Sequence, residues 1–192
     1  MHLQTESPQA ESEQDAAGAV AERPPSAERT PSAARPPSAD RTLGFTEIKK
    51  WLRHRHPMIY IDRIVDHEPG VFIKSLLSVS GNLEAIAGHF PERAVFPGSH
   101  LMQAFAQTGI ILYQLSTSPL AEDELTLIGS VTSRFTKPVV PGDQVVFDVR
   151  VDGLRGNVCF FSCHATVDGA RVATFKGSLV RTKVAEMGRQ LW

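Results

Sequence analysis

The sequence predicts an α+β domain in which an antiparallel sheet wraps around one long central helix. The helix prediction rests on residues 99–116, where apolar side chains recur at helical spacing and cover nearly the whole circumference, as is typical of a buried helix. The sheet prediction rests on six strand-type runs, two before this helix and four after it, separated mostly by turn residues. We expect the last four strands to follow one another in meander order.

The remaining elements follow from local signals along the chain. Thr46 is expected to cap a short helix over 47–53, with Glu47 favourably placed in its first turn. The segment 81–98 contains several glycines and prolines and is predicted to be irregular. The pair Asp168-Gly169 is the strongest hairpin signal in the chain. The predicted strands occupy 58–67, 71–80, 125–135, 144–154, 157–168 and 171–181.

Residues 1–42 are predicted to form a disordered tail outside the folded domain. They hold six of the thirteen prolines, no aromatic residue, and a degenerate repeat that begins with proline and serine over 24–42. Such a segment buries too little apolar surface to offset the entropy lost on ordering. The predicted organisation is therefore the tail, one domain over 43–182, and a C-terminal extension over 183–192.

Charge and hydropathy exclude several classes of protein. The formal net charge is −1, which gives no argument for binding nucleic acid or a membrane surface. No apolar stretch approaches the roughly 20 residues that span a bilayer, and a secretory signal pattern is absent at the start. We therefore expect a soluble cytoplasmic protein. Cys159 and Cys163 are expected to be core-facing thiols, and neither a metal nor a cofactor is predicted.

Five motifs stand in order over residues 43–182. They are 52–63 (LRHRHPMIYIDR), 88–91 (GHFP), 96–98 (FPG), 103–107 (QAFAQ) and 134–143 (RFTKPVVPGD). Together they resemble the (3R)-hydroxyacyl-[acyl-carrier-protein] dehydratases of fatty acid synthesis. Any one motif alone would be a weak signal, but five in register are specific. The tail lies outside the resemblance.

The resemblance implies a hotdog fold and a dimer with an acyl tunnel at the subunit interface. It implies that His89 removes the C2 proton of a 3-hydroxyacyl thioester, that the N–H of Gly98 polarises the thioester carbonyl, and that a cis peptide follows the histidine. General chemistry agrees with both roles. An imidazole titrates near neutral pH, and a helix-starting amide stabilises a developing enolate oxygen.

Position 103 departs from the family pattern, which has Glu or Asp as the acid supplied by the other subunit. Gln103 cannot donate a proton as a general acid. Three explanations remain open. A related Glu-bearing subunit completes the site in a heterodimer; His100, on the same helix face, replaces the acid; or the protein catalyses isomerisation of an enoyl thioester, for which one base is enough.

Further residues take part in the resemblance. Gln107 is expected to orient Gln103 through an i,i+4 hydrogen bond. Phe90, Met102, Phe105 and Gln107 are candidates to line the acyl tunnel, and core packing explains Met102 and Phe105 equally well. Arg134 and Lys137 are candidates to attract a negatively charged acyl carrier protein, and a solvated edge is the equal alternative.

The expected function is dehydration of 3-hydroxyacyl thioesters on an acyl carrier protein to trans-2-enoyl thioesters in a specialised fatty-acid or polyketide pathway. We expect a homodimer or a heterodimer with a related subunit. A non-catalytic subunit of a heterodimer and a hotdog thioesterase remain alternatives, besides the isomerase.

Overall fold

The structure, a computed structural model, describes residues 39–189. Most of the predicted tail and the last three residues of the predicted extension lie outside the described residues. The first described residues, Ala39–Arg41, form a 3-10 helix, η1, within the predicted tail. There the Nε atom of Arg41 lies 2.9 Å from the Oδ1 atom of Asp66 and donates to the carbonyl oxygen of His67.

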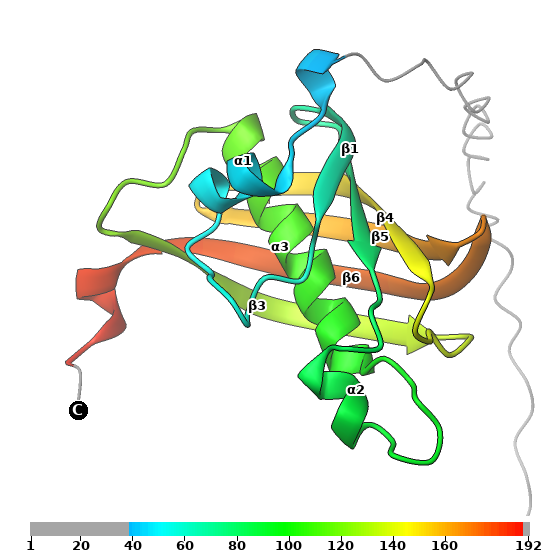
Figure 1. Ribbon diagram of the computed structural model, residues 1–192. Helices are drawn as coiled ribbons and strands as arrows, with labels where there is room; N and C mark the ends of the chain where they lie inside the picture. Colours follow the sequence, from blue (N-terminus) through cyan, green and yellow to red (C-terminus); the bar gives the residue numbers. More distant parts are fainter. Residues whose placement is uncertain (1–38, 190–192) are drawn as a thin grey trace, which may run out of the picture. The chain divides into compact units, whose positions relative to one another are not determined.

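The six predicted strands form one antiparallel sheet, but the order of the strands corrects the sequence prediction. The strands are β1 Arg63–Glu68, β2 Phe72–Ser78, β3 Glu124–Phe135, β4 Gln144–Arg155, β5 Val158–Val167 and β6 Ala170–Lys183. They lie in the order β1-β2-β4-β5-β6-β3 (Figure 1). The expected meander is therefore wrong at β3, which pairs with β6 and not with β4.

The connection from β3 to β4 explains this order. Residues 136–143 contain two prolines and are too long for a tight hairpin. Val139 is buried, and its carbonyl oxygen accepts a hydrogen bond from Phe96 N–H at 2.7 Å. Gly142 N–H donates to Val79 at 2.9 Å. These bonds hold the connection across the end of the sheet, so that it enters β4 beside β2.

The long central helix is confirmed as α3, Gly98–Ser116, which lies across the sheet (Figure 1). All side chains from Ala104 to Gln114 are buried, as the apolar pattern predicted. A shorter helix, α1, runs over Phe45–Trp51, two residues earlier than expected, because the Glu47 carboxylate accepts from Gly44 N–H and caps the start there. A five-residue helix, α2 Glu84–Gly88, lies in the segment predicted to be irregular.

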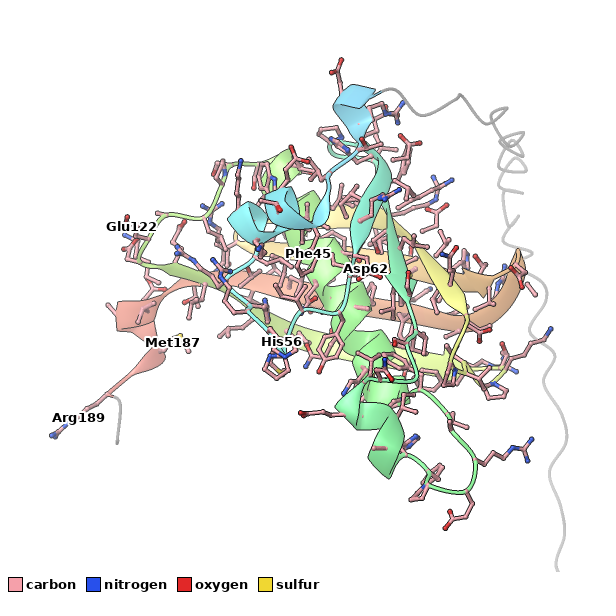
Figure 2. All side chains as sticks on the ribbon, in the orientation of Figure 1. Phe45, His56, Asp62, Glu122, Met187 and Arg189 are labelled. Carbon is pink, nitrogen blue, oxygen red and sulfur yellow. The ribbon has the colours of Figure 1, made fainter. Side chains whose placement is uncertain are left out.

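The first predicted strand, 58–67, is ordered only in part as a strand. The side chain of Gln107 on α3 accepts from Tyr60 N–H at 2.9 Å and donates to the Met58 carbonyl oxygen at 2.6 Å. These backbone groups are thereby bound to the central helix instead of a neighbouring strand. The segment before β1 is consequently a connection that runs along α3, with His56 exposed on it (Figure 2).

The core fills the space between α3 and the sheet. Phe147, Phe161 and Phe175 are among the largest fully buried side chains. Cys159 and Cys163 are free and buried, as predicted, and burial raises the pKa of the Cys159 thiol to about 11. Both cysteines are therefore unreactive packing residues. No helix within residues 39–189 combines the length and apolar character needed to span a membrane.

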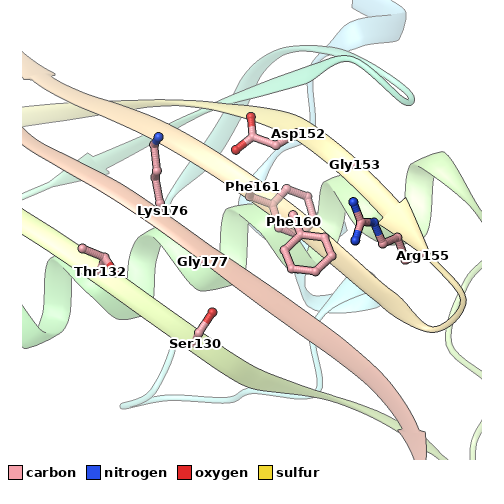
Figure 3. A pocket seen from close by; sticks show the side chains of 9 residues that line it. All are labelled: Ser130, Thr132, Asp152, Gly153, Arg155, Phe160, Phe161, Lys176 and Gly177. Atoms are coloured by element: carbon pink, nitrogen blue, oxygen red, sulfur yellow. The ribbon is translucent and has the colours of Figure 1, made fainter. Parts of the chain in front are cut away.

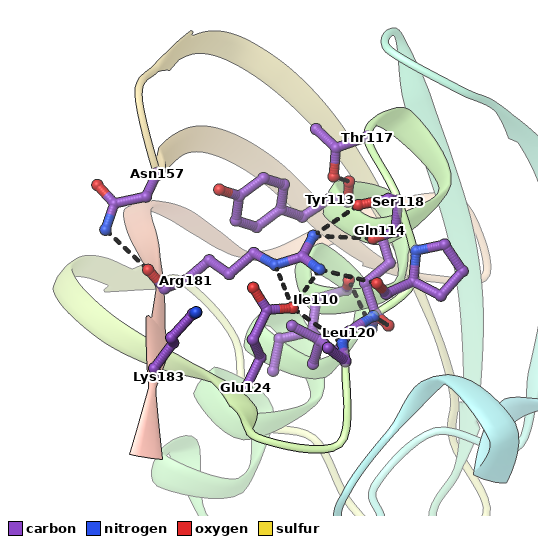
Figure 4. A network of polar contacts seen from close by, with 12 residues as sticks. Ile110, Tyr113, Gln114, Thr117, Ser118, Leu120, Glu124, Asn157, Arg181 and Lys183 are labelled. Carbon is purple, nitrogen blue, oxygen red and sulfur yellow. Dashed lines mark hydrogen bonds and ion pairs between the residues drawn. The ribbon is translucent and has the colours of Figure 1, made fainter. Parts of the chain in front are cut away.

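An ion pair between β3 and β6 fixes the loop that follows α3. Figure 4 shows the Arg181 guanidinium bonded to Glu124 and to the carbonyl oxygens of Ser118 and Pro119. The hydrogen bond from Arg181 is the main reason that the pKa of Glu124 lies below its ordinary value. This one guanidinium thus anchors both the loop and the start of β3 to β6.

The variant Glu124→Gln should change how stability depends on pH. Because the folded-state pKa of Glu124 is lowered, ionised Glu124 contributes stability above its ordinary pKa, and that contribution is lost as the pH falls through the lowered folded-state value. The melting temperature of the native protein should therefore exceed that of the variant near pH 7, and the difference should shrink below about pH 4. Glu122→Gln, an exposed change nearby, is the control. A difference that is constant with pH would contradict this role.

Candidate active site

His89 is held at the end of α2 by paired hydrogen bonds. Its Nδ1 atom lies 2.9 Å from the Val95 carbonyl oxygen, and Val95 N–H donates back to the His89 carbonyl oxygen at 2.9 Å. Since a carbonyl oxygen can only accept, Nδ1 carries the hydrogen, and in the neutral ring Nε2 has the free lone pair. The ring is therefore oriented as a base whose reactive atom is Nε2. The expected cis peptide at His89-Phe90 is confirmed.

Gly98 is the first residue of α3, where backbone N–H groups lack intrahelical acceptors. A side chain at this position would collide with Phe135, because a Cβ atom would lie 2.9 Å from the Cζ atom of that ring. Glycine therefore lets the aromatic ring of β3 pack directly on the start of the helix. This contact joins residues 37 positions apart in the sequence.

The His89 pocket, as we call it, is an open cavity of about 350 Å³ that contains both His89 and Gly98. Its size lies within the range of small-molecule sites. The full lining is His89, Val95, Phe96, Gly98, Leu101, Phe135, Thr136, Lys137, Pro138 and Val139. The structure thus brings the predicted base and the predicted amide donor together.

Sequence reasoning missed several residues of this pocket, above all Phe135 and Thr136. The RFTKPVVPGD motif contains both residues, but only Arg134 and Lys137 were singled out there, because of their charge. The collision of a Cβ at position 98 with Phe135 is visible only in three dimensions. The available signal was an aromatic residue at the last position of the predicted strand 125–135.

Gln103 does not line the His89 pocket of its own chain. Its side chain is half-buried on α3, and within residues 39–189 it has no hydrogen-bond partner. The expected bond from Gln107 is not formed, because Gln107 binds the backbone of Met58 and Tyr60. A single chain therefore presents the base and the amide in one pocket and the position-103 side chain elsewhere.

His100 lies one turn before Gln103 and packs edge-on against Tyr60, with ring centroids 4.8 Å apart. Its Nδ1 atom lies 3.2 Å from the Ser99 hydroxyl. Burial, and then repulsion from His89, lowers the pKa of His100. A lowered pKa reduces the imidazolium fraction at neutral pH, which makes His100 a poor reservoir for a catalytic proton.

The four residues expected along an acyl tunnel do not share one cavity in the single chain. Phe90 stacks on the His89 ring with centroids 4.1 Å apart and is exposed, whereas Phe105 is buried against Phe175. Met102 is half-buried, and Gln107 is fully buried. A tunnel that includes all four remains a prediction for a dimer.

The two residues expected to dock a carrier protein are both exposed. Lys137 lines the His89 pocket, and Arg134 lies near the end of β3, one residue before Phe135. Neither is engaged in an ion pair within the described part of the chain. Two cationic side chains are thus available beside the pocket.

A larger cavity of about 440 Å³ lies away from the candidate site. Figure 3 shows Asp152, Arg155, Phe160 and Lys176 around it on the sheet, with α3 behind. Its lining includes none of the candidate site residues that the sequence singled out. No group of three or more His, Cys, Asp or Glu side chains in residues 39–189 is arranged to hold a metal ion.

Comparison with known proteins agrees with this geometry. The FabA-like domain family matches residues 52–176. The chain is 62% identical over 152 residues to the coronafacic acid dehydratase of Pseudomonas savastanoi pv. glycinea, covering 79% of this chain and 92% of that protein. It is 38% identical over 137 residues to the 3-hydroxyacyl-[acyl-carrier-protein] dehydratase FabZ of Aliivibrio fischeri, covering 70% and 91%.

Solved structures confirm the hotdog fold. The dehydratase heterocomplex ApeI:P from Xenorhabdus doucetiae superposes with a TM-score of 0.63 at 12% identity, covering 73% of this chain and 93% of that one. A hot-dog-like protein from Thermanaerovibrio acidaminovorans gives a TM-score of 0.52 at 19% identity, covering 62% and 86%. At these identities the similarity concerns the fold alone.

Proposed function

Because the chain belongs to the family of FabA-like domains, we propose that it dehydrates 3-hydroxyacyl thioesters on an acyl carrier protein to trans-2-enoyl thioesters. The observation that carries this proposal is that His89, whose ring is held by Val95, and Gly98, the first residue of α3, line the same pocket. The identity to two proteins named as dehydratases supports the same reaction.

The proposed reaction assigns one role to each of these two residues. Nε2 of His89 takes the proton from C2, and the electrons of that C–H bond form the C2=C3 double bond as the C3 hydroxyl leaves with a second proton as water. The thioester oxygen gains negative charge while C2 loses its proton. The Gly98 amide and the positive end of the α3 dipole stabilise that charge.

The second proton requires an acid that this chain does not place at position 103. We propose that a related Glu-bearing subunit supplies it across a dimer interface. The free edge of β3 supports such an association, because Leu127, Ile128 and Phe135 are 41%, 45% and 45% exposed along it. A long apolar edge strand is a template for pairing with another chain. A homodimer would present only the carboxamide of Gln103.

We place the reaction in a specialised pathway, in the cytoplasm, with an acyl carrier protein as the carrier. The relative at 62% identity is named for coronafacic acid, and the FabZ relative is less similar at 38%. Arg134 and Lys137 beside the pocket would attract a negatively charged carrier protein. Specialisation also agrees with the loss of the carboxylate at position 103.

Isomerisation of an enoyl thioester is the second candidate, and the same Gln103 favours it. Moving a double bond needs one base that removes and returns a proton, and His89 is sufficient for that. No water is lost in this reaction. Mass spectrometry of the acyl carrier conjugate therefore separates the two candidates.

The test is an assay on a 3-hydroxyacyl carrier thioester with this protein alone and with co-purified Glu-bearing relatives. We expect slow loss of water with the lone protein and fast loss with a partner. If the protein alone removes water fast, and His100→Ala does so equally fast, then neither a Glu-bearing partner nor His100 supplies the second proton. Release of free acid would indicate a thioesterase, and absence of any reaction in every combination would favour a non-catalytic subunit.

A further inference from the structure

Phe90 follows His89 in the chain, and packing in the core does not explain the position of its ring. Phe90 is 53% exposed. Its ring stacks on the His89 ring, with centroids 4.1 Å apart and 27° between the two planes. Because a phenyl ring that stays largely in water gains little from burial, the contact with the imidazole requires another explanation.

Backbone hydrogen bonds hold Phe90 in this position. Phe90 N–H donates to the Arg93 carbonyl oxygen at 3.2 Å, and Arg93 N–H donates back to the Phe90 carbonyl oxygen at 3.0 Å. The bonds between His89 and Val95 join the flanking residues of the same loop. The loop over 89–95 is therefore bonded across itself at both aromatic residues, and fixed backbone presents the two rings side by side.

The stack supplies a constraint that the hydrogen bond of the His89 ring does not supply. The bond between Nδ1 and the Val95 carbonyl oxygen fixes one atom of the imidazole, and the ring can still tilt about it. Such a tilt moves Nε2, which lies on the other side of the ring. Phe90 covers one face of the imidazole and opposes the tilt. Displacing a reacting group by about 1 Å can lower a rate about 10²-fold.

The stack also favours the charged imidazole that the proposed reaction creates. When Nε2 takes the C2 proton, His89 becomes an imidazolium. The face of a phenyl ring is negative because of its quadrupole, and it attracts a cation within about 6 Å of its centroid. The 4.1 Å between the two centroids lies inside this range. Since the attraction grows as the proton is transferred, it is stronger in the transition state than in the resting enzyme.

We propose that Phe90 is a positioning residue that acts through His89, because it fixes the tilt of the imidazole and stabilises the imidazolium. The inference rests on the proposed function, which takes His89 to be the base. A residue that only lines an acyl tunnel would contact the acyl group instead. The two roles differ in their kinetics, since a positioning residue changes kcat and an acyl contact changes KM.

The kinetic experiment measures dehydration of a 3-hydroxyacyl carrier thioester by Phe90→Leu, which keeps an apolar side chain and removes the π face. The full chain is assayed in the native and in the Gln103→Glu backgrounds. We expect kcat to fall about tenfold with KM unchanged. Phe90→Tyr, which keeps the π face, should recover most of the native kcat. Phe160→Leu, at a 38% exposed aromatic residue of β5, is the matched control and should keep the native kcat.

Nuclear magnetic resonance tests the stack without any reaction. The ring current of a phenyl ring above an imidazole shifts the carbon-bound protons of that imidazole upfield. With isotope-labelled histidine in the full chain, the His89 signals are assigned by their loss in His89→Ala. Phe90→Leu should remove the upfield shift, Phe90→Tyr should keep it, and Phe160→Leu should leave the His89 signals unchanged.

The outcomes separate this inference from the proposed function. A native kcat in Phe90→Leu, a change confined to KM, or an equal loss of kcat in Phe90→Tyr would each overturn the positioning role. Unchanged His89 signals in Phe90→Leu would show that the stack does not form in solution, and would overturn it as well. All of these results leave the proposed function standing. Absence of dehydration in every form would overturn the proposed function, and with it the catalytic effect of the stack.

Discussion

Replacing His89 by alanine is expected to lower the rate of dehydration about 10²–10⁴-fold, the usual contribution of a positioned general base. The ring is fixed by Val95 on one side, and among the residues that line the His89 pocket it is the only imidazole. Loss of water from a 3-hydroxyacyl carrier thioester, followed by mass spectrometry, measures the effect. The measurement is made in the native and in the Gln103→Glu backgrounds.

Binding separates catalysis from damage to the fold in this variant. His89→Ala should still bind the thioester, since the pocket walls come from α3, β3 and the 136–139 segment. His164→Ala, an exposed histidine on β5, should leave the rate unchanged. If His89→Ala keeps full activity with an intact fold, the base lies elsewhere and the proposed mechanism is wrong.

The variant Gln103→Glu is expected to increase the dehydration rate of the lone protein about 10²–10⁴-fold, because it restores a proton donor at the position where the family has one. The half-buried position on α3 accommodates the change, since a carboxyl and a carboxamide are nearly equal in size. Gln144→Glu at the exposed start of β4 adds the same charge away from the site and is the control. The dehydration rate of Gln103→Glu should fall when the dimer dissociates, because each site would take His89 from one chain and the carboxyl group at position 103 from the other.

The same variant distinguishes the explanations for Gln103. The heterodimer proposal would be wrong if Gln103→Glu raises the dehydration rate of the protein alone while a Glu-bearing partner leaves the rate of the native protein unchanged. An unchanged rate in Gln103→Glu would show that position 103 does not supply the proton. His100→Ala should have little effect in either background, because burial and His89 both lower the pKa of His100.

The sequence predicts local and periodic features of this fold well. The helix over α3, the strand periodicity of β4 to β6 and the buried cysteines depend on side-chain spacing, which the sequence shows directly. The position of β3 beside β6 depends instead on backbone bonds of the 136–143 connection to Phe96 and Val79. No periodic pattern in the sequence encodes such bonds. The sequence therefore predicts only the simplest order, in which consecutive strands pair with one another.

The sequence likewise predicts some features of the candidate site and misses others. His89 and Gly98 lie in short motifs with a chemical meaning, and the structure places them in one pocket. Gln107 was expected to bind a residue on its own helix, but its carboxamide binds backbone groups nearly fifty residues earlier. The i,i+4 rule identifies possible partners on the same helix. It does not show whether a segment from elsewhere in the chain offers a better hydrogen-bond partner.

The pairing of β3 with β6 has a consequence for biosynthesis. The histidine and the helix to which we assign the chemistry are synthesised before the second half of the sheet, yet Phe135 reaches Gly98 only on a strand whose partner in the sheet is β6. A nascent chain that stops short of β6 has nothing to hold that aromatic wall in place. Prematurely terminated products should therefore be unable to retain substrate, even when every chemically reactive residue has already been translated.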